Sequence, residues 1–177
     1  MLGSIRLRAS RFYVENTRWG MRPPRISTWS YGRGSIVFLT IVTHQHRPIF
    51  GRIRNGDMLL SPAGSIMHRL LQELHHHAEI EMHAFVVMPD HIHVLFTIHS
   101  RPHSKAHSRK YGDLVPGTLP VIVRSLKSAA TKQIREECPE LTNKTIWQRN
   151  YYESLIPKEA IESIRRYILN NPRNWKG

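Results

Sequence analysis

The chain has 177 residues, the length of one compact domain that can bury its own core. Its 26 lysines and arginines outnumber its 13 aspartates and glutamates, and the net charge of +13 favours a polyanionic partner, above all nucleic acid, over a membrane surface. Apolar runs no longer than a strand argue against a membrane-spanning helix, and the single cysteine, Cys138, argues against a disulfide framework and indicates a cytoplasmic protein.

The N-terminal part of the sequence differs from the rest. Residues 1–30 have no hydrophobic period and contain Pro23 and Pro24, which predicts a flexible basic arm ahead of a single domain over residues 31–177. The Arg-rich, acid-poor composition of this arm is also typical of an organelle transit peptide, and a start at Met21 is a third interpretation. The residues alone do not choose among these three.

The remaining sequence predicts four strands and three helices from its hydrophobic periodicity and turn residues. In chain order we expect a strand over 36–43, a turn-rich stretch over 47–56, a helix with Ser61 as its N-cap, strands over 79–88 and 91–98, a basic loop over 100–117, a helix over 119–137, a strand over 146–156 and a helix over 158–170. This β-α-β-β-α-β-α order predicts an α+β, ferredoxin-like fold with one antiparallel sheet and helices on one face.

Positive charge is segregated along the chain. Residues 1–54 carry ten arginines and one acidic residue, whereas residues 55–100 carry one arginine and five acidic residues. A second basic cluster lies in the loop over 100–117. Such segregation is typical of a binding face, although charge that serves only solubility stays open as the alternative.

Two histidines stand two residues apart in the strand over 91–98. Because side chains alternate along a strand, His91 and His93 project from one face while Ile92 and Val94 project from the other. Their Cβ atoms then lie about 6–7 Å apart, close enough for both imidazoles to bind one metal ion, and zinc is the ion that imidazole chemistry suggests. Two histidines on a solvated strand face are the alternative, but the tight turn before the pair and its apolar flanks favour a metal site.

The other histidines are not predicted to be metal ligands. His44 and His46 follow the first strand and lead into a basic turn. Residues 75–77 are consecutive histidines at the end of a helix, where side chains fan around the axis and cannot converge on one ion.

The last helix carries a tyrosine beside its apolar stripe. Ile161, Ile164 and Ile168 form the stripe, Tyr167 lies on its flank, and Asn171 follows one turn later on the same side. A tyrosine in this place could address a metal site on the adjoining sheet. The alternative, which the pattern alone favours, is an amphipathic tyrosine at the rim of the core.

Three segments together resemble a known family: VMPDHIHV at 87–94, WQRNYYE at 147–153 and RYILNNP at 166–172. They are similar to the single-tyrosine HUH transposases, specifically the REP-associated tyrosine transposase branch, and the similarity runs over about 35–175. The resemblance implies the HUH endonuclease fold, with the histidine pair near the centre of a four- or five-stranded sheet and the tyrosine helix beside it.

The resemblance also implies the site residues. His91, His93 and Asn171 would bind Mg²⁺ or Mn²⁺, and Tyr167 would be the catalytic nucleophile. Family members form a 5′-phosphotyrosine, release a free 3′-OH, and act on single-stranded DNA that bears imperfect palindromic hairpins. The implied activity is therefore that of a DNA nicking and strand-transfer enzyme, as a monomer or homodimer, whose nucleophile has a pKa near 10 and needs a metal ion to react at neutral pH.

Contacts to DNA are expected from basic and aromatic residues. The predicted phosphate contacts are Arg124, Lys127, Lys132, Arg149, Arg165 and Arg166. Trp29 and Trp147 are candidates for stacking on unpaired bases, and Tyr151 and Tyr152 are expected to support the core or the DNA groove. Two other functions stay open: a protein that recognises structured DNA or RNA without cutting it, and a zinc hydrolase with a small substrate.

Overall fold

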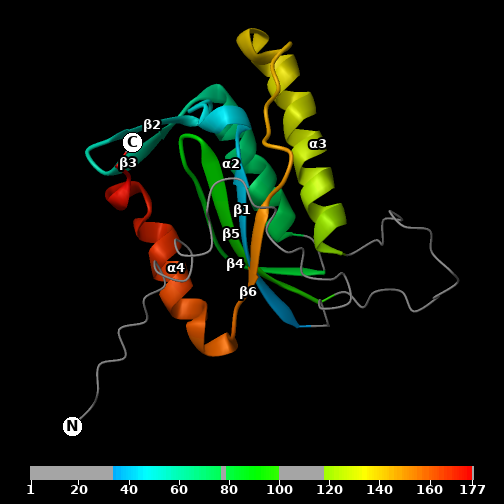
Figure 1. Ribbon diagram of the computed structural model, residues 1–177, viewed down its shortest axis with the longest axis vertical. Helices are drawn as coiled ribbons and strands as arrows, with labels where there is room; N and C mark the ends of the chain where they lie inside the picture. Colours follow the sequence, from blue (N-terminus) through cyan, green and yellow to red (C-terminus); the bar gives the residue numbers. More distant parts are fainter. Residues whose placement is uncertain (1–33, 77–78, 100–117, 177) are drawn as a thin grey trace, which may run out of the picture.

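The structure is a computed structural model that describes residues 34–76, 79–99 and 118–176, so the predicted basic arm, Trp29 and the basic loop lie outside the described residues (Figure 1). A four-stranded sheet in the order β4-β5-β1-β6, with every neighbouring pair antiparallel, forms its centre. The strands are β1 (Ser35–Val42), β4 (Ile80–Val87), β5 (His91–Ile98) and β6 (Tyr152–Leu155). The α+β fold and its antiparallel sheet are as predicted.

Strand β5 lies between β4 and β1 and is buried along nearly its whole length. A tight turn at Pro89 and Asp90 joins β4 to β5, and it closes with a hydrogen bond from Met88 N to His91 O of 2.8 Å. The first residue after this turn is His91, so the turn determines where the predicted metal site begins on the sheet.

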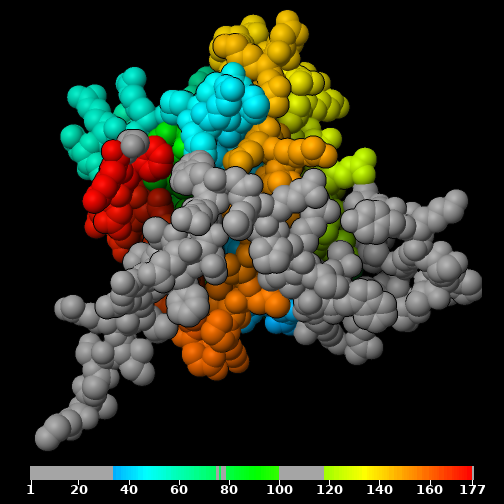
Figure 2. All heavy atoms as spheres, in the orientation of Figure 1, coloured from blue at the N-terminus to red at the C-terminus, as the bar shows by residue number. Residues whose placement is uncertain are grey.

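A hairpin that the sequence analysis missed lies between β1 and the first helix. It consists of β2 (Gly51–Arg54) and β3 (Asp57–Leu60), joined by Asn55 and Gly56 with φ values of 54° and 82°. Positive φ at both positions is the signature of the type I′ hairpin turn. The predicted turn-rich stretch therefore contains a turn at these two residues, but the prediction missed the strands beside it, because four-residue strands are too short to give a clear period. The hairpin lies beside the C-terminal residues at one edge of the molecule (Figure 2).

Two helices cover one face of the sheet: α2 (Pro62–His75) and α3 (Leu119–Glu137). Ser61 caps α2 as predicted, since its Oγ accepts a hydrogen bond of 3.1 Å from Gly64 N. The main core lies between these helices and the sheet residues Val37, Leu39, Ile41, Ile92, Val94, Phe96 and Ile98. Within the described ranges, no helix has the length and apolar character that crossing a membrane requires.

The last helix, α4 (Ile161–Asn170), covers the opposite face of the sheet, so α3 and α4 lie on either side of the strands (Figure 1). Its Ile168 packs with Phe38 and Leu95 in a second, smaller cluster. The prediction that all helices cover one face was wrong. The physical reason is that β1 and β5 carry large apolar side chains on both faces, and each apolar face must be buried.

Two predicted boundaries also change. A 3-10 helix (Lys158–Ala160) precedes α4, so the α-helix starts three residues later than expected. The strand predicted over 146–156 forms regular pairs only as β6, and its earlier part makes one isolated bridge between Trp147 and Thr43. Residues 147–150 instead lie against α3, as described below.

Candidate active site

His91 and His93 project from the same face of β5, as the alternation of side chains predicted. Their Nε2 atoms are 3.2 Å apart and their ring centroids 4.6 Å apart. His93 is almost completely buried, with 3% of its surface exposed, whereas His91 lies nearer the surface. The pair therefore forms one compact site at the start of the central strand.

Both Nδ1 atoms of the pair have oxygen partners. His91 Nδ1 is 2.6 Å from Asp90 Oδ1, and His93 Nδ1 is 2.8 Å from the Thr40 hydroxyl. Thr40 belongs to β1 and is paired in register with His93. Burial raises the pKa of Asp90, but hydrogen bonds and charges from His91 and His46 lower it by more, so the carboxyl group is ionised at neutral pH. An ionised carboxylate only accepts hydrogen bonds, so His91 donates Nδ1–H to it, and in the neutral imidazole the lone pair is then on Nε2.

His93 is uncharged at neutral pH, because burial, and less strongly the repulsion between its imidazolium and a protonated His91, hold its pKa well below 6.5. When His93 donates Nδ1–H to Thr40, two Nε2 lone pairs face each other. Ligand nitrogens about 2.1 Å from a cation, and about 100° apart as seen from it, lie about 3.2 Å from each other. The 3.2 Å between the two Nε2 atoms therefore fits a shared metal ion of this size.

The third predicted ligand, Asn171, is the C-cap residue of α4 and is buried, with 9% of its surface exposed. In the part of the chain that the structure describes, no cluster of three or more His, Cys, Asp or Glu side chains that could hold a metal occurs. A further protein ligand from those residues would therefore have to be of another type, such as an amide oxygen, which suits Mg²⁺ and Mn²⁺. The role of Asn171 as a ligand stays a prediction.

Tyr167 lies on the face of the sheet that carries the histidine pair. Its ring centroid is 5.6 Å from that of His93, and its ring packs edge-on against Phe38 at 6.1 Å. The side chain is partly buried at the border of the smaller core cluster, beside the stripe of Ile161, Ile164 and Ile168. The site thus brings together one phenol and two imidazoles from β5 and α4.

A second tyrosine shares this face. Thr40 is in register with His93 on one side and with Tyr152 on the other, so Tyr152 projects from the same face as His93, two strand spacings or about 10 Å away. Tyr151 instead packs against the main core, as expected of a supporting residue.

Five of the six predicted DNA contacts are exposed: Arg124, Lys132, Arg149, Arg165 and Arg166. Lys127 is different, because its Nζ donates hydrogen bonds to the backbone oxygens of Gln148 and Asn150, at 2.8 and 3.0 Å. Burial lowers the pKa of Lys127 to about 8. Lys127 therefore anchors the segment before β6, at Gln148 and Asn150, to α3.

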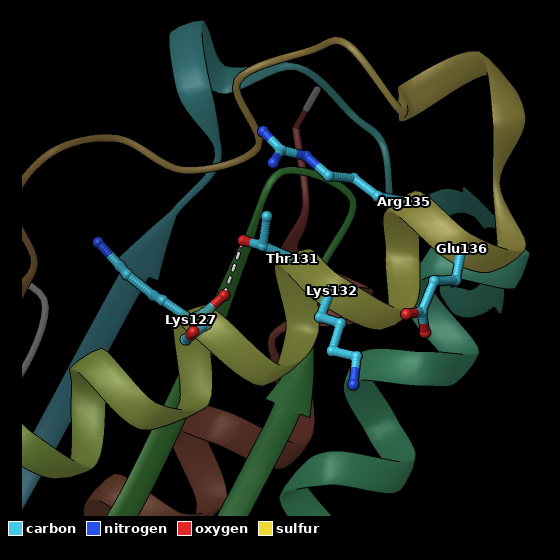
Figure 3. Close-up of a pocket in the computed structure, with 6 residues that line it drawn as sticks. Lys127, Thr131, Lys132, Arg135 and Glu136 are labelled. Atoms are coloured by element: carbon cyan, nitrogen blue, oxygen red, sulfur yellow. Dashed lines mark hydrogen bonds between the residues drawn. The ribbon is translucent and has the colours of Figure 1, made fainter.

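Trp147 also anchors this segment to α3. Its indole N–H is 3.2 Å from both Lys127 O and the Thr131 hydroxyl, and its ring packs against Phe50. A shallow pocket runs along this side of α3, with Lys127, Thr131, Lys132, Arg135 and Glu136 among its lining residues (Figure 3). Three of these five side chains are basic, which makes the pocket a candidate surface for phosphate groups.

Sequence reasoning missed the residues that surround the histidine pair. Thr40 is a polar residue that interrupts the apolar run of β1, and this was an available signal. Asp90 was interpreted only as a turn residue, and His46 only as a residue unsuited to metal binding, yet His46 Nδ1 lies 3.1 Å from Asp90 Oδ2. Trp175, whose ring centroid is 5.8 Å from that of His91, gave no signal because it follows the last helix.

Comparisons with known proteins find similar sequences and a similar fold. A family model described as "Transposase IS200 like" matches residues 116–171, which include α3, β6, Tyr167 and Asn171. An uncharacterized protein of Haemophilus influenzae is 28% identical over 164 residues, which cover 88% of this chain and 89% of the relative.

Among solved structures, a REP-associated tyrosine transposase bound to a REP hairpin matches with a TM-score of 0.56 and 18% identity, over 87% of this chain and 74% of that chain. A putative transposase from Deinococcus radiodurans matches with a TM-score of 0.48 and 18% identity, over 85% of this chain and 97% of the other. The first of these two matches shows that the chain has the same fold as the hairpin-bound protein.

Proposed function

We propose that the chain is a member of the IS200-like transposase family, whose model matches residues 116–171, and that it is a metal-dependent endonuclease and strand-transferase for single-stranded, hairpin-bearing DNA. One observation carries the proposal: the phenol of Tyr167 packs against the imidazole of His93, on the face of β5 that also carries His91. A nucleophile and a pair of metal ligands on one face are what cleavage of a phosphodiester by a tyrosine requires.

In this proposal His91, His93 and Asn171 hold Mg²⁺ or Mn²⁺, which polarises the scissile phosphate when bound. The Tyr167 oxygen attacks phosphorus, and its bond to phosphorus forms as the bond to the 3′ oxygen breaks. The phenol loses its proton and the leaving 3′ oxygen gains one, which leaves a 5′-phosphotyrosine and a free 3′-OH. Because the phosphotyrosine conserves the phosphodiester bond energy, attack by another 3′-OH rejoins a strand and frees Tyr167.

We propose a DNA hairpin as the substrate because the solved structure with the same fold is of a protein bound to a REP hairpin. The proposed phosphate contacts are the five exposed residues Arg124, Lys132, Arg149, Arg165 and Arg166. Lys127 already donates to two backbone oxygens, so we expect its replacement to act on DNA binding through the segment that it holds. The cytoplasm is the proposed compartment, in keeping with the free thiol of Cys138.

The decisive experiment compares two tyrosines on the same face of the sheet. Labelled hairpin DNA and Mn²⁺ should give a denaturation-resistant protein–DNA adduct with the natural protein and with Tyr152→Phe, but none with Tyr167→Phe. Both variants lose only a hydroxyl group, so general damage to the fold would affect them alike. A normal adduct with Tyr167→Phe would show that the nucleophile is a different residue.

Metal dependence is tested in the same assay with Mg²⁺, Mn²⁺ and Zn²⁺ added to protein first treated with EDTA. We expect cleavage with Mg²⁺ or Mn²⁺ and none without a divalent ion. Hairpin binding that persists in EDTA, together with no nicking in any of the three metals, would instead identify a protein that binds structured nucleic acid without cutting it.

A further inference from the structure

We propose that Asp90 is a positioning residue that holds His91 as its Nδ1–H tautomer, and that His46 in turn holds the Asp90 carboxylate in place. The metal-binding consequence of this inference rests on the proposed function, whereas the tautomer of His91 is a property of the protein alone. The geometry that carries it is a carboxylate shared between two imidazoles: Asp90 Oδ1 lies 2.6 Å from His91 Nδ1, and Asp90 Oδ2 lies 3.1 Å from His46 Nδ1.

Asp90 is buried, and backbone hydrogen bonds hold the turn that carries it. Only 8% of the residue surface is exposed. The backbone on either side of this carboxylate is bonded to the segment after β1, since Thr43 N donates to Asp90 O at 2.8 Å and Phe50 N donates to Pro89 O at 3.0 Å. The turn before the histidine pair is therefore attached to a distant segment of the sequence, between Thr43 and Phe50, and His46 lies within that segment.

The segment that presents His46 has an unusual backbone. Gln45 and His46 have φ values of 56° and 53°, and both are non-glycine residues in the left-handed region. Such conformations persist where the surroundings over-determine them, and they are found preferentially at functional sites. Here Thr43 Oγ1 donates to Arg47 O at 2.8 Å, and the Arg47 guanidinium donates to Thr145 O and His44 O. These bonds hold the turn that aims His46 at Asp90.

The chemical consequence concerns the lone pair of His91. The nitrogen that carries the proton in a neutral imidazole is determined by the hydrogen bond that the other nitrogen makes. A carboxylate at Nδ1 holds the proton there, so Nε2 keeps its lone pair on the side of His93 Nε2, 3.2 Å away, where it could bind a metal ion. Without the carboxylate, a proton on Nε2 would occupy the place of the metal ion.

The tautomer is measured directly by long-range ¹H–¹⁵N correlation of the histidine rings in the metal-free protein. We expect His91 to be the Nδ1–H tautomer in the natural protein and to become mixed or Nε2–H in Asp90→Asn. The Asp90→Asn side chain suits a tight turn as well as aspartate does, so a residue that served only the turn would leave the ring signals unchanged. An unchanged His91 tautomer in Asp90→Asn would overturn the inference.

Manganese affinity provides the second readout, by electron paramagnetic resonance of free Mn²⁺ in a titration without DNA. We expect Asp90→Asn to weaken Mn²⁺ binding by about 10- to 100-fold, the usual effect of losing such a partner. His46 has 40% of its side chain exposed, so His46→Ala should weaken binding by only about two- to fivefold. If Asp90→Asn does not fold, His46→Ala alone decides the inference, and unchanged Mn²⁺ affinity in that variant would contradict it.

The matched control is a carboxylate–histidine pair at the other end of the same sheet. Glu81 Oε2 lies 3.0 Å from His99 Nε2, just beyond the last residue of β5. Glu81→Gln should leave the His91 tautomer and Mn²⁺ affinity unchanged. A natural protein that binds no Mn²⁺ would count against the proposed function, and the tautomer measurement would still decide the role of Asp90.

Discussion

The hydrogen-bond partner of each Nδ1 atom determines how the two imidazoles of the histidine pair are oriented. Thr40 reaches His93 at Nδ1 and Asp90 reaches His91 at Nδ1, so both imidazoles turn the same nitrogen, Nε2, toward the space between them. One partner is a neighbouring residue in sequence and the other comes from the strand next to β5. The same two histidines with other partners would not make the same site.

Replacement of the buried Thr40 hydroxyl tests this dependence. Thr40→Val keeps the shape of the side chain but removes the partner at 2.8 Å from His93 Nδ1. We expect it to lower the free energy of unfolding by about 1–3 kcal/mol, the cost of a lost buried hydrogen-bond partner, as measured by urea denaturation. Thr40→Ser retains the hydroxyl and serves as the control. Equal stabilities of the two variants would argue against the importance of this bond.

Lys127 predicts a pH dependence of stability. Burial lowers its pKa to about 8 from 10.5, so between these values the unfolded chain binds more protons than the folded protein. The free energy of unfolding that depends on Lys127 should therefore increase as the pH rises through this window. Urea denaturation at pH 7, 8.5 and 10 should give a stability difference between the natural protein and Lys127→Met that grows with pH. The exposed Lys132→Met on the same helix should give a difference that stays constant.

Helix α4 acts as an element in two ways, because it buries the second face of the sheet and carries the nucleophile that we propose. Ile168, on the side of the helix that faces the sheet, packs with Phe38 and Leu95. Tyr167, beside it on the helix, contacts the ring of His93. The burial of the sheet face and the position of the Tyr167 phenol therefore depend on the same packing of α4 against the sheet. A small rotation of α4 would move both the apolar stripe and the phenol.

Two neighbouring residues of α4 separate packing from surface effects. Ile168 is fully buried and Leu169 is 58% exposed. We expect Ile168→Ala to lower the free energy of unfolding by about 2–5 kcal/mol, because it leaves a cavity against the sheet. Leu169→Ala should change it by less than about 0.5 kcal/mol. Thermal or urea denaturation measures both, and similar losses for the two variants would mean that α4 is not seated as described.

Over the whole molecule, the net charge of +13 predicts that the proposed binding to nucleic acid is largely electrostatic. Binding that releases counterions from phosphates weakens as salt rises, and the slope counts the contacts. The exposed arginines on α4 flank the nucleophile that we propose, so they are suited to hold the strand near the site.

Arg166→Gln should therefore weaken hairpin binding and reduce the slope of log Kd against log salt by about 0.7–1. Fluorescence anisotropy at several salt concentrations measures the slope. Arg69→Gln is the control, because the Arg69 guanidinium is bonded to Gln133 and Glu137 on α3 and is not a predicted DNA contact. Identical slopes for both variants would place the DNA on another surface.

The sequence by itself determined the order of the four sheet strands and the three α-helices, the Ser61 cap, the limits of β5 and α3, and the shared face of His91 and His93. All of these follow from local rules, since periodicity, caps and alternation act over a few residues. The short β2–β3 hairpin was missed because its signal is weak. Only the tertiary structure decided that Thr40 faces His93, that His46 meets Asp90, that Lys127 holds the segment before β6 and that α4 covers the second face. These contacts join residues far apart in the chain, and strand pairing and burial select them only when the whole sheet has formed.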